Sequence, residues 1–180
     1  MKNITKYLLA LLVVAGVSSG CDNFVSPSVD QNKPTDTVIQ SVDDLQAVVK
    51  GGYDYLNDVE LYGRDFYVSG DVMSDNAFSN GNSGRFVVQD QMIFSVNSGY
   101  AAGVWEVFYE AIANANLALG ADLEGDGVAQ IKGEAYALRA FSHMNILLAF
   151  GQQYVSGGDA SDGVPYVTTY ADSDQFAPSR

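Results

Sequence analysis

Two aspartates and an asparagine lie close together in the segment Ser69–Asn76, namely Asp71, Asp75 and Asn76. Paired carboxylates are typical of glycoside hydrolases, and oxygen-rich loops are typical of calcium sites. No second acidic cluster follows them, and their spacing is not that of a calcium-binding loop. The favoured interpretation is therefore helix capping and loop ordering, and the alternative is contact with a sugar hydroxyl or an ion.

The single histidine, His143, is expected on the same helix face as Lys132, Tyr136 and Arg139, where a solvated or interface position is the default. Because there is no second histidine and only one cysteine, the sequence predicts no metal centre and no cofactor. It also contains no Ser-His-Asp arrangement, P-loop or dinucleotide fingerprint. Arg139 is a candidate partner for an acid of residues 71–75.

The single cysteine, Cys21, follows a short basic region and an apolar stretch in the order typical of an export signal. The stretch spans 11 residues, 7–17, which is fewer than the roughly 20 needed to cross a bilayer. The sequence VSSGC that ends at Cys21 resembles a bacterial lipobox, and the alternative is an ordinary secretory signal. We therefore expect a lipoprotein signal peptide at residues 1–20, a lipid on Cys21 and a tether over residues 21–40.

Acidic residues dominate the composition, with 22 Asp and Glu against nine Lys and Arg and a formal net charge of −13. Loss of residues 1–20 removes two lysines, which leaves seven basic residues and a net charge of −15. Such a charge disfavours nucleic acid and anionic membrane surfaces as partners. The remaining chain is long enough for one domain with its own core. The 11 tyrosines fit either sugar contact or helix packing, and composition alone favours packing.

A capping signal predicts a helix that begins after Ser41. Ser41 with Asp44 three residues later forms a capping box, and apolar residues recur at helical spacing over residues 45–56. Gly51 and Gly52 are unfavourable inside a helix, so they predict a close approach of another helix.

Two longer helices are expected at residues 101–120 and 129–150, and the short glycine-containing loop between them predicts an antiparallel helical hairpin. Trp105 lies on the apolar stripe of the first helix, which favours core packing. Asn116 lies near the centre of that stripe, and Glu134 lies on the apolar side of the second helix. We therefore expect Asn116 and Glu134 to hydrogen-bond to each other or to share a partner.

The segment 58–99 is rich in Gly, Asn, Ser and Asp and is expected to form a long ordered loop. Weak strand character occurs only at residues 86–88 and 92–94. A short extended segment is expected at residues 163–167.

Four segments, in this order, resemble the N-terminal part of the SusD/RagB family of outer-membrane lipoproteins. They are the lipobox ending at Cys21, DDLQAVVKGGYD from Asp43, WEVFYEAIANAN from Trp105, and GEAYALRAF from Gly133. The resemblance covers nearly the whole chain. It implies a mainly α fold of tetratricopeptide-like antiparallel helix pairs with long ordered loops over residues 41–180, truncated at the C-terminus relative to the family.

The resemblance also implies a non-catalytic protein, lipid-anchored at the outer membrane and exposed on the cell surface. Its partners would be an oligosaccharide or other nutrient and a SusC-like TonB-dependent transporter that receives it. In the family the loop before the Trp-bearing helix contributes to the glycan site, which gives these candidate contacts: Asp71, Asp75, Asn76, Phe78, Asn80, Asn82, Arg85 and Tyr100. Rings would stack on apolar sugar faces, and polar side chains would bond to hydroxyls. The alternatives are a helical-repeat scaffold without a sugar site and a secreted glycoside hydrolase.

Overall fold

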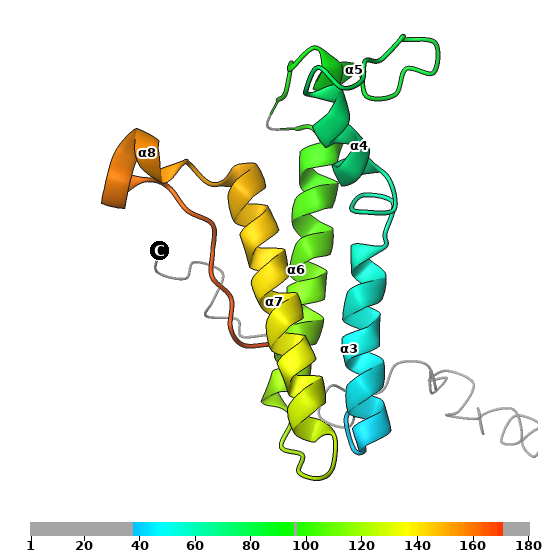
Figure 1. Cartoon of the computed structure of the whole chain (residues 1–180), viewed down its shortest axis with the longest axis vertical. Coiled ribbons are helices and arrows are strands. Elements are labelled where there is room, and N and C mark those ends of the chain that lie inside the picture. Colours follow the sequence, from blue (N-terminus) through cyan, green and yellow to red (C-terminus); the bar gives the residue numbers. More distant parts are fainter. Residues whose placement is uncertain (1–37, 96, 171–180) are drawn as a thin grey trace, which may run out of the picture. The chain divides into compact units, whose positions relative to one another are not determined.

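The computed structural model describes residues 38–95 and 97–170, which belong to a compact unit separate from residues 1–37. The described residues form these helices: α3 (Val42–Leu56), α4 (Asp65–Val72), α5 (Val87–Asp90), α6 (Gly99–Gly120), α7 (Val128–Phe150), α8 (Tyr154–Gly157) and the 3-10 turn η2 (Gly158–Ala160) (Figure 1). They contain no strand, so the predicted mainly α class is confirmed. The expected signal peptide, Cys21 and most of the tether lie outside the described residues. Within the described part, no helix is both long and apolar enough to span a bilayer.

The N-terminus of α3 is capped as the sequence predicts. The Asp44 N–H donates to Ser41 Oγ at 3.1 Å, and the Ser41 hydroxyl donates to Asp44 Oδ2 at 2.7 Å. The same Asp44 oxygen accepts the Gln40 N–H at 3.2 Å. Aspartate therefore replaces the usual longer acid of a capping box, and its charge suits the positive end of the helix.

Helices α3, α6 and α7 lie side by side and bury the first part of the core (Figure 1). Its buried members are small and branched apolar side chains, namely Leu45, Val49, Ala115, Ala118, Val128, Ile131, Ala135 and Leu138. A Cβ atom added at Gly52 would lie 2.5 Å from Leu138 Cδ2 and 3.4 Å from Asn114 Cβ. The close approach predicted from the glycine pair is confirmed, because α3 contacts both α6 and α7 at this point.

A second cluster of buried residues lies between the loop after α3, α6 and the later part of α7. Its members are Leu61, Val104, Val107, Phe108, Ile112 and Ile146. The Phe66 and Phe108 rings meet edge to face with centroids 5.3 Å apart, and Trp105 meets Phe150 in the same way at 5.3 Å. Trp105 is half-buried against this cluster, which confirms its predicted packing role.

The segment 58–99 differs from prediction in its local structure. It contains α4, which the sequence analysis missed, and the predicted strand character at residues 86–88 and 92–94 is wrong. Phe86 and Met92 adopt φ values of 58° and 54°, in the left-handed region, so the chain turns through α5 instead of extending. Asp90 Oδ1 accepts the Ser79 N–H at 3.1 Å, which holds the preceding loop against α5.

Residues 164–169, called the strap below, return from α8 and lie along α6 and α7 (Figure 1). The Tyr109 hydroxyl donates to the Pro165 carbonyl at 2.8 Å, and the Val167 N–H donates to His143 Nε2 at 3.1 Å. Burial raises the pKa of Tyr109 to about 12, so this phenol remains a donor. Side chains of both hairpin helices therefore hold the strap.

Asn116 is buried as predicted, but its partners differ from the prediction. Its Nδ2 donates to the Val167 carbonyl at 3.1 Å and to the Thr169 carbonyl at 3.4 Å, and its Oδ1 accepts from Arg139 at 3.0 Å. Glu134 is half-buried and instead accepts from Gln130 at 3.4 Å in its own helix. The predicted pairing of Asn116 with Glu134 is thus wrong, because the strap supplies the carbonyls that the amide needs.

Two predictions about α7 are also corrected by the strap. Arg139 donates to Asn116 and to the Thr168 carbonyl and lies 5.1 Å from the Tyr136 ring centroid, so it does not pair with an acid of residues 71–75. His143 is 7% exposed rather than solvated. Its Nε2 accepts from the strap, which makes Nδ1 the protonated nitrogen facing the Arg139 carbonyl at 2.9 Å.

Candidate functional site

The candidate glycan contacts lie around α4, α5 and the start of α6. Most belong to an exposed loop, residues 74–86, that follows α4 (Figure 1). Short-range bonds order this loop: the Asn82 N–H donates to Asn80 Oδ1 at 3.0 Å, and the Ser79 hydroxyl donates to the Arg85 carbonyl at 2.8 Å. The loop therefore has a defined shape that its own polar residues maintain.

Phe78 is the most exposed aromatic side chain of this loop, with 81% of its surface open to solvent. Asn80, Asn82 and Arg85 follow it within the same loop and are also exposed. In the described part of the chain the side chains of Asn82 and Arg85 have no hydrogen-bond partner, so their donors face water. An exposed ring in the same loop as exposed amide and guanidinium groups has the chemistry of a carbohydrate platform.

The acidic residues before the loop have a more modest local role. Asp71 lies in the last turn of α4, and its backbone carbonyl accepts the Ser74 hydroxyl at 2.8 Å and the Ala77 N–H at 3.2 Å. The Asn76 N–H donates to Ser74 Oγ at 3.3 Å. The side chains of Asp71, Asp75 and Asn76 are exposed. The backbone of Asp71, and not its carboxylate, thus orders this turn.

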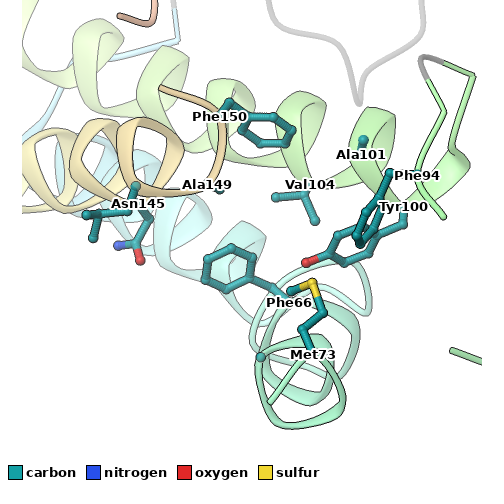
Figure 2. A pocket seen from close by; sticks show the side chains of 11 residues that line it. Phe66, Met73, Phe94, Tyr100, Ala101, Val104, Asn145, Ala149 and Phe150 are labelled. Atoms are coloured by element: carbon teal, nitrogen blue, oxygen red, sulfur yellow. The ribbon is translucent and has the colours of Figure 1, made fainter. Parts of the chain in front are cut away.

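The environment of Tyr100 differs from that of the loop residues, because Tyr100 lines an apolar cavity. The cavity has a volume of about 590 Å³ and lies between α4, α6 and the end of α7 (Figure 2). Its lining is almost entirely apolar: Phe66, Gly70, Met73, Phe94, Tyr100, Ala101, Val104, Asn145, Leu148, Ala149 and Phe150. Figure 2 shows the Tyr100 hydroxyl directed toward the side chains across this space. Asn145, the other polar residue, already accepts from Tyr62 and donates to the Phe141 carbonyl.

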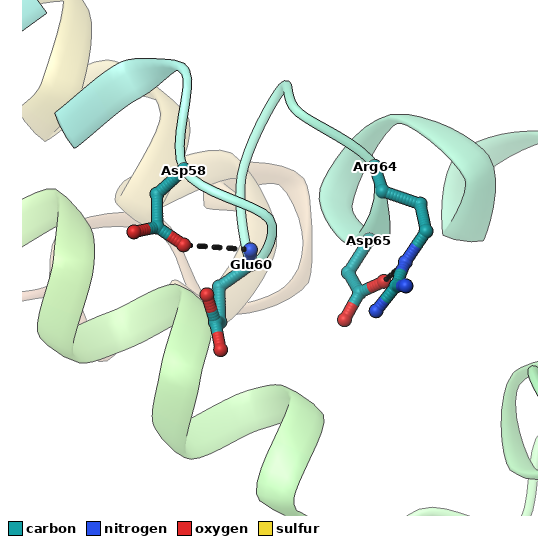
Figure 3. Close-up of polar contacts among 4 residues, drawn as sticks. All are labelled: Asp58, Glu60, Arg64 and Asp65. Carbon is teal, nitrogen blue, oxygen red and sulfur yellow. Dashed lines mark hydrogen bonds and ion pairs between the residues drawn. The ribbon is translucent and has the colours of Figure 1, made fainter. Parts of the chain in front are cut away.

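A pair of carboxyl groups does form, but in the turn between α3 and α4 (Figure 3). Asp58 Oδ1 accepts the Glu60 N–H at 3.2 Å, and a hydrogen bond between the two carboxyl groups lowers the pKa of Asp58 and raises that of Glu60. Arg64 pairs with Asp65 at 2.6 Å next to them. The cavity lining contains no carboxyl group, so this pair belongs to the turn and not to the cavity.

Neither the loop nor the cavity gathers metal ligands. Among residues 38–95 and 97–170, no group of three or more His, Cys, Asp and Glu side chains is close enough to hold a metal ion. Aromatic stacking, hydrogen bonding and apolar burial are the interactions that these two features can provide.

A comparison with known families gives the context of this loop and cavity. A family model described as starch-binding proteins associating with the outer membrane, the SusD-like family, matches residues 24–180. The chain belongs to the SusD-like family. No curated protein and no solved structure matches the chain. SusD-like proteins are generally non-catalytic binding proteins, and the family description supplies both the outer membrane and a carbohydrate as context.

The sequence of this SusD-like chain predicts the loop but not the cavity. Phe66, Met73 and Phe94 lie in short apolar runs, at residues 66–68, 72–73 and 92–94, within a segment rich in polar residues. These runs are the available signal, because apolar side chains in such a segment usually pack against something. Without α4, however, nothing in the sequence placed the three on one surface.

Proposed function

We propose that this chain captures an oligosaccharide at the cell surface and delivers it to a SusC-like TonB-dependent transporter without chemical conversion. The family match supports a carbohydrate role at the outer membrane. The observation that carries the proposal is the exposed Phe78 ring in a loop, residues 74–86, that also carries exposed Asn and Arg side chains. We also propose that the antiparallel helix pairs are tetratricopeptide-like.

The chemistry of the loop matches a sugar because a pyranose has apolar C–H faces and a polar rim. The Phe78 ring would cover one face, and the Asn82 amide and Arg85 guanidinium would donate to hydroxyls at the rim. Asp75 and Asn76, exposed at the start of the loop, would supply acceptors. Tyr100 faces an apolar space and has no comparable set of polar neighbours, so we assign the sugar contacts to the loop.

Calorimetric titration with soluble starch and a panel of other polysaccharides tests this assignment. Because an aromatic contact contributes about 0.5–1.5 kcal/mol, Phe78→Ala should weaken binding roughly threefold to tenfold. Tyr136→Ala is the matched control, since Tyr136 is 57% exposed on α7 and outside the loop. Equal affinity of the wild type and Phe78→Ala for every bound glycan would exclude the loop as the platform.

The anchoring part of the proposal concerns residues outside the described range. We propose a signal peptide at residues 1–20, a lipid on Cys21, a tether over residues 21–40 and a SusD-like domain over residues 41–180, at the outer membrane. Two or more acyl chains give stable attachment, whereas a single chain does not. Cys21→Ser should therefore move the protein from the membrane fraction to the soluble fraction, and retention in the membrane would refute the lipid anchor.

A second candidate function, a scaffold that binds only protein, is favoured by the exposed apolar surface late in α7 and in α8. Met144, Leu147, Leu148 and Val155 are all exposed there, with Val155 at 88%. Surfaces of this kind mark protein interfaces more often than sugar sites. No binding across the polysaccharide panel, together with co-purification of a transporter, would favour the scaffold.

A further inference from the structure

We propose that the cavity between α4, α6 and α7 is a binding site for a small uncharged ring compound that carries one hydroxyl group. The site is distinct from the glycan platform, because its lining and its polar atoms differ from those of the 74–86 loop. The inference rests on the cavity volume, on its uncharged lining and on the Tyr100 hydroxyl in its wall.

The volume and lining set the size and polarity of the ligand. A space of about 590 Å³ lies within the usual range for small-molecule pockets. Four aromatic rings contribute to its wall, from Phe66, Phe94, Tyr100 and Phe150. No charged side chain lines it, and the chain as a whole is acidic, so an anion is the least suitable ligand.

The Tyr100 hydroxyl sets the position of the polar atom of the ligand. Ser69 is fully buried on α4, and its hydroxyl completes no hydrogen bond within the described residues. Burial raises the pKa of the Tyr100 phenol, and Ser69 has a smaller, opposite effect on it. Ser69 does not line the cavity, so the Tyr100 oxygen is the hydroxyl that a ligand can reach.

A ligand hydroxyl beside Tyr100 would meet the one hydroxyl group of the cavity wall. The Tyr100 phenol can donate a hydrogen bond to the ligand oxygen or accept one from the ligand O–H. Water is a poor substitute throughout the rest of the cavity, because a bound water needs two to four polar partners and the apolar wall does not provide them. A ring with a single hydroxyl satisfies both regions of the site at once.

The glycines of the chain provide a matched pair of test variants. Gly70 lines the cavity, and a Cβ atom added there meets nothing within 4 Å, so Gly70→Leu directs a side chain into open space. Gly133 in α7 is equally open and lies outside the lining. Both changes replace a helical glycine with a better helix former, so they differ chiefly in whether they fill the cavity.

Fluorescence titration with 2-naphthol and with naphthalene tests the proposal on the purified chain. The wild type and Gly133→Leu should bind 2-naphthol saturably and with equal affinity, and Gly70→Leu should bind it at least about tenfold more weakly. Ala101→Leu, a second filling variant, repeats the test if Gly70→Leu fails to fold. Tyr100→Phe should weaken 2-naphthol binding about tenfold and leave naphthalene binding unchanged, since one hydrogen bond is worth about that factor.

Three results would overturn the proposal. They are the absence of saturable 2-naphthol binding by the wild type, undiminished binding by the folded filling variants, and equal loss of both probes in Tyr100→Phe. Phe78→Ala should not change naphthol binding, so failure of this site and failure of the glycan platform are separable. Binding that Phe78→Ala abolishes would place the probe on the loop and would also refute the cavity assignment.

Discussion

Replacing Asn116 with alanine should release the strap while the three-helix core stays folded. Asn116 is 2% exposed and makes two hydrogen bonds of 3.0 and 3.1 Å, to Arg139 and to the Val167 carbonyl, and a longer one of 3.4 Å to the Thr169 carbonyl. Alanine leaves the two stronger partners without the amide and adds nothing in its place.

The expected loss of stability follows from these contacts. The bond to the Val167 carbonyl is worth about 1 kcal/mol, and the charge-assisted bond to Arg139 about 1.5 kcal/mol. The long bond to Thr169 adds little, and Arg139 and Val167 are half-buried, so water replaces part of the loss. Asn116→Ala should therefore lower the free energy of unfolding by about 2 to 3 kcal/mol.

Urea unfolding followed by circular dichroism measures this loss, and amide hydrogen exchange locates it. The Val167 N–H should exchange faster in Asn116→Ala, because the strap is then held mainly by His143 and Tyr109. Asn145→Ala is the matched control, since its bonds to Tyr62 and the Phe141 carbonyl are exposed and their loss should cost under about 1 kcal/mol. Equal costs for the two variants, or unchanged exchange at Val167, would refute the role assigned to Asn116.

Three further predictions address other contacts. Burial, with a smaller contribution from the nearby Arg139 charge, lowers the pKa of His143 below its usual 6.5. Between the two pKa values the unfolded chain binds more protons than the folded one, so wild-type stability should fall as pH drops from 6.5 through the folded pKa. His143→Gln should remove this slope in urea unfolding. Ser41→Ala removes the cap of α3 and should cost about 1 kcal/mol in the same assay, whereas a cost near zero would show that Asp44 caps the helix alone. Phe108→Ala empties a fully buried ring position and should cost about 3 to 5 kcal/mol, lowering the thermal midpoint; a smaller loss would mean that the aromatic cluster collapses around the gap.

The parts of the fold that depend on local pattern were predictable from the sequence. The cap at Ser41, the glycine contact at Gly52 and the two long helices each depend on residues within a few positions or on a repeating apolar face. The hairpin followed from the short loop between the helices. These features lie where local preference and tertiary packing agree.

The strap and the cavity could not be predicted, because both depend on contacts between distant segments. The sequence predicts that Asn116 and Glu134 share a contact only if the hairpin alone satisfies both. The strap, some 50 residues beyond Asn116, supplies carbonyls to Asn116, and Glu134 bonds within its own helix. Helix α4 carries a glycine and β-branched residues that weaken its local signal. Its position determines the cavity, so the cavity was missed with it.

The internal bonding of the 74–86 loop has a consequence for how such proteins diversify. Its order comes from bonds at Ser79, Asn80 and Ser83 within the loop and from ties to Asp90 and to the Asp71 carbonyl. The side chains of Phe78, Asn82 and Arg85 are exposed and support no helix. Substitutions at those three projecting positions should leave the unfolding free energy nearly unchanged. With the loop as the proposed glycan platform, selection can alter the preferred ligand without a compensating change in the three-helix core, and ligand preference can diverge faster than the scaffold.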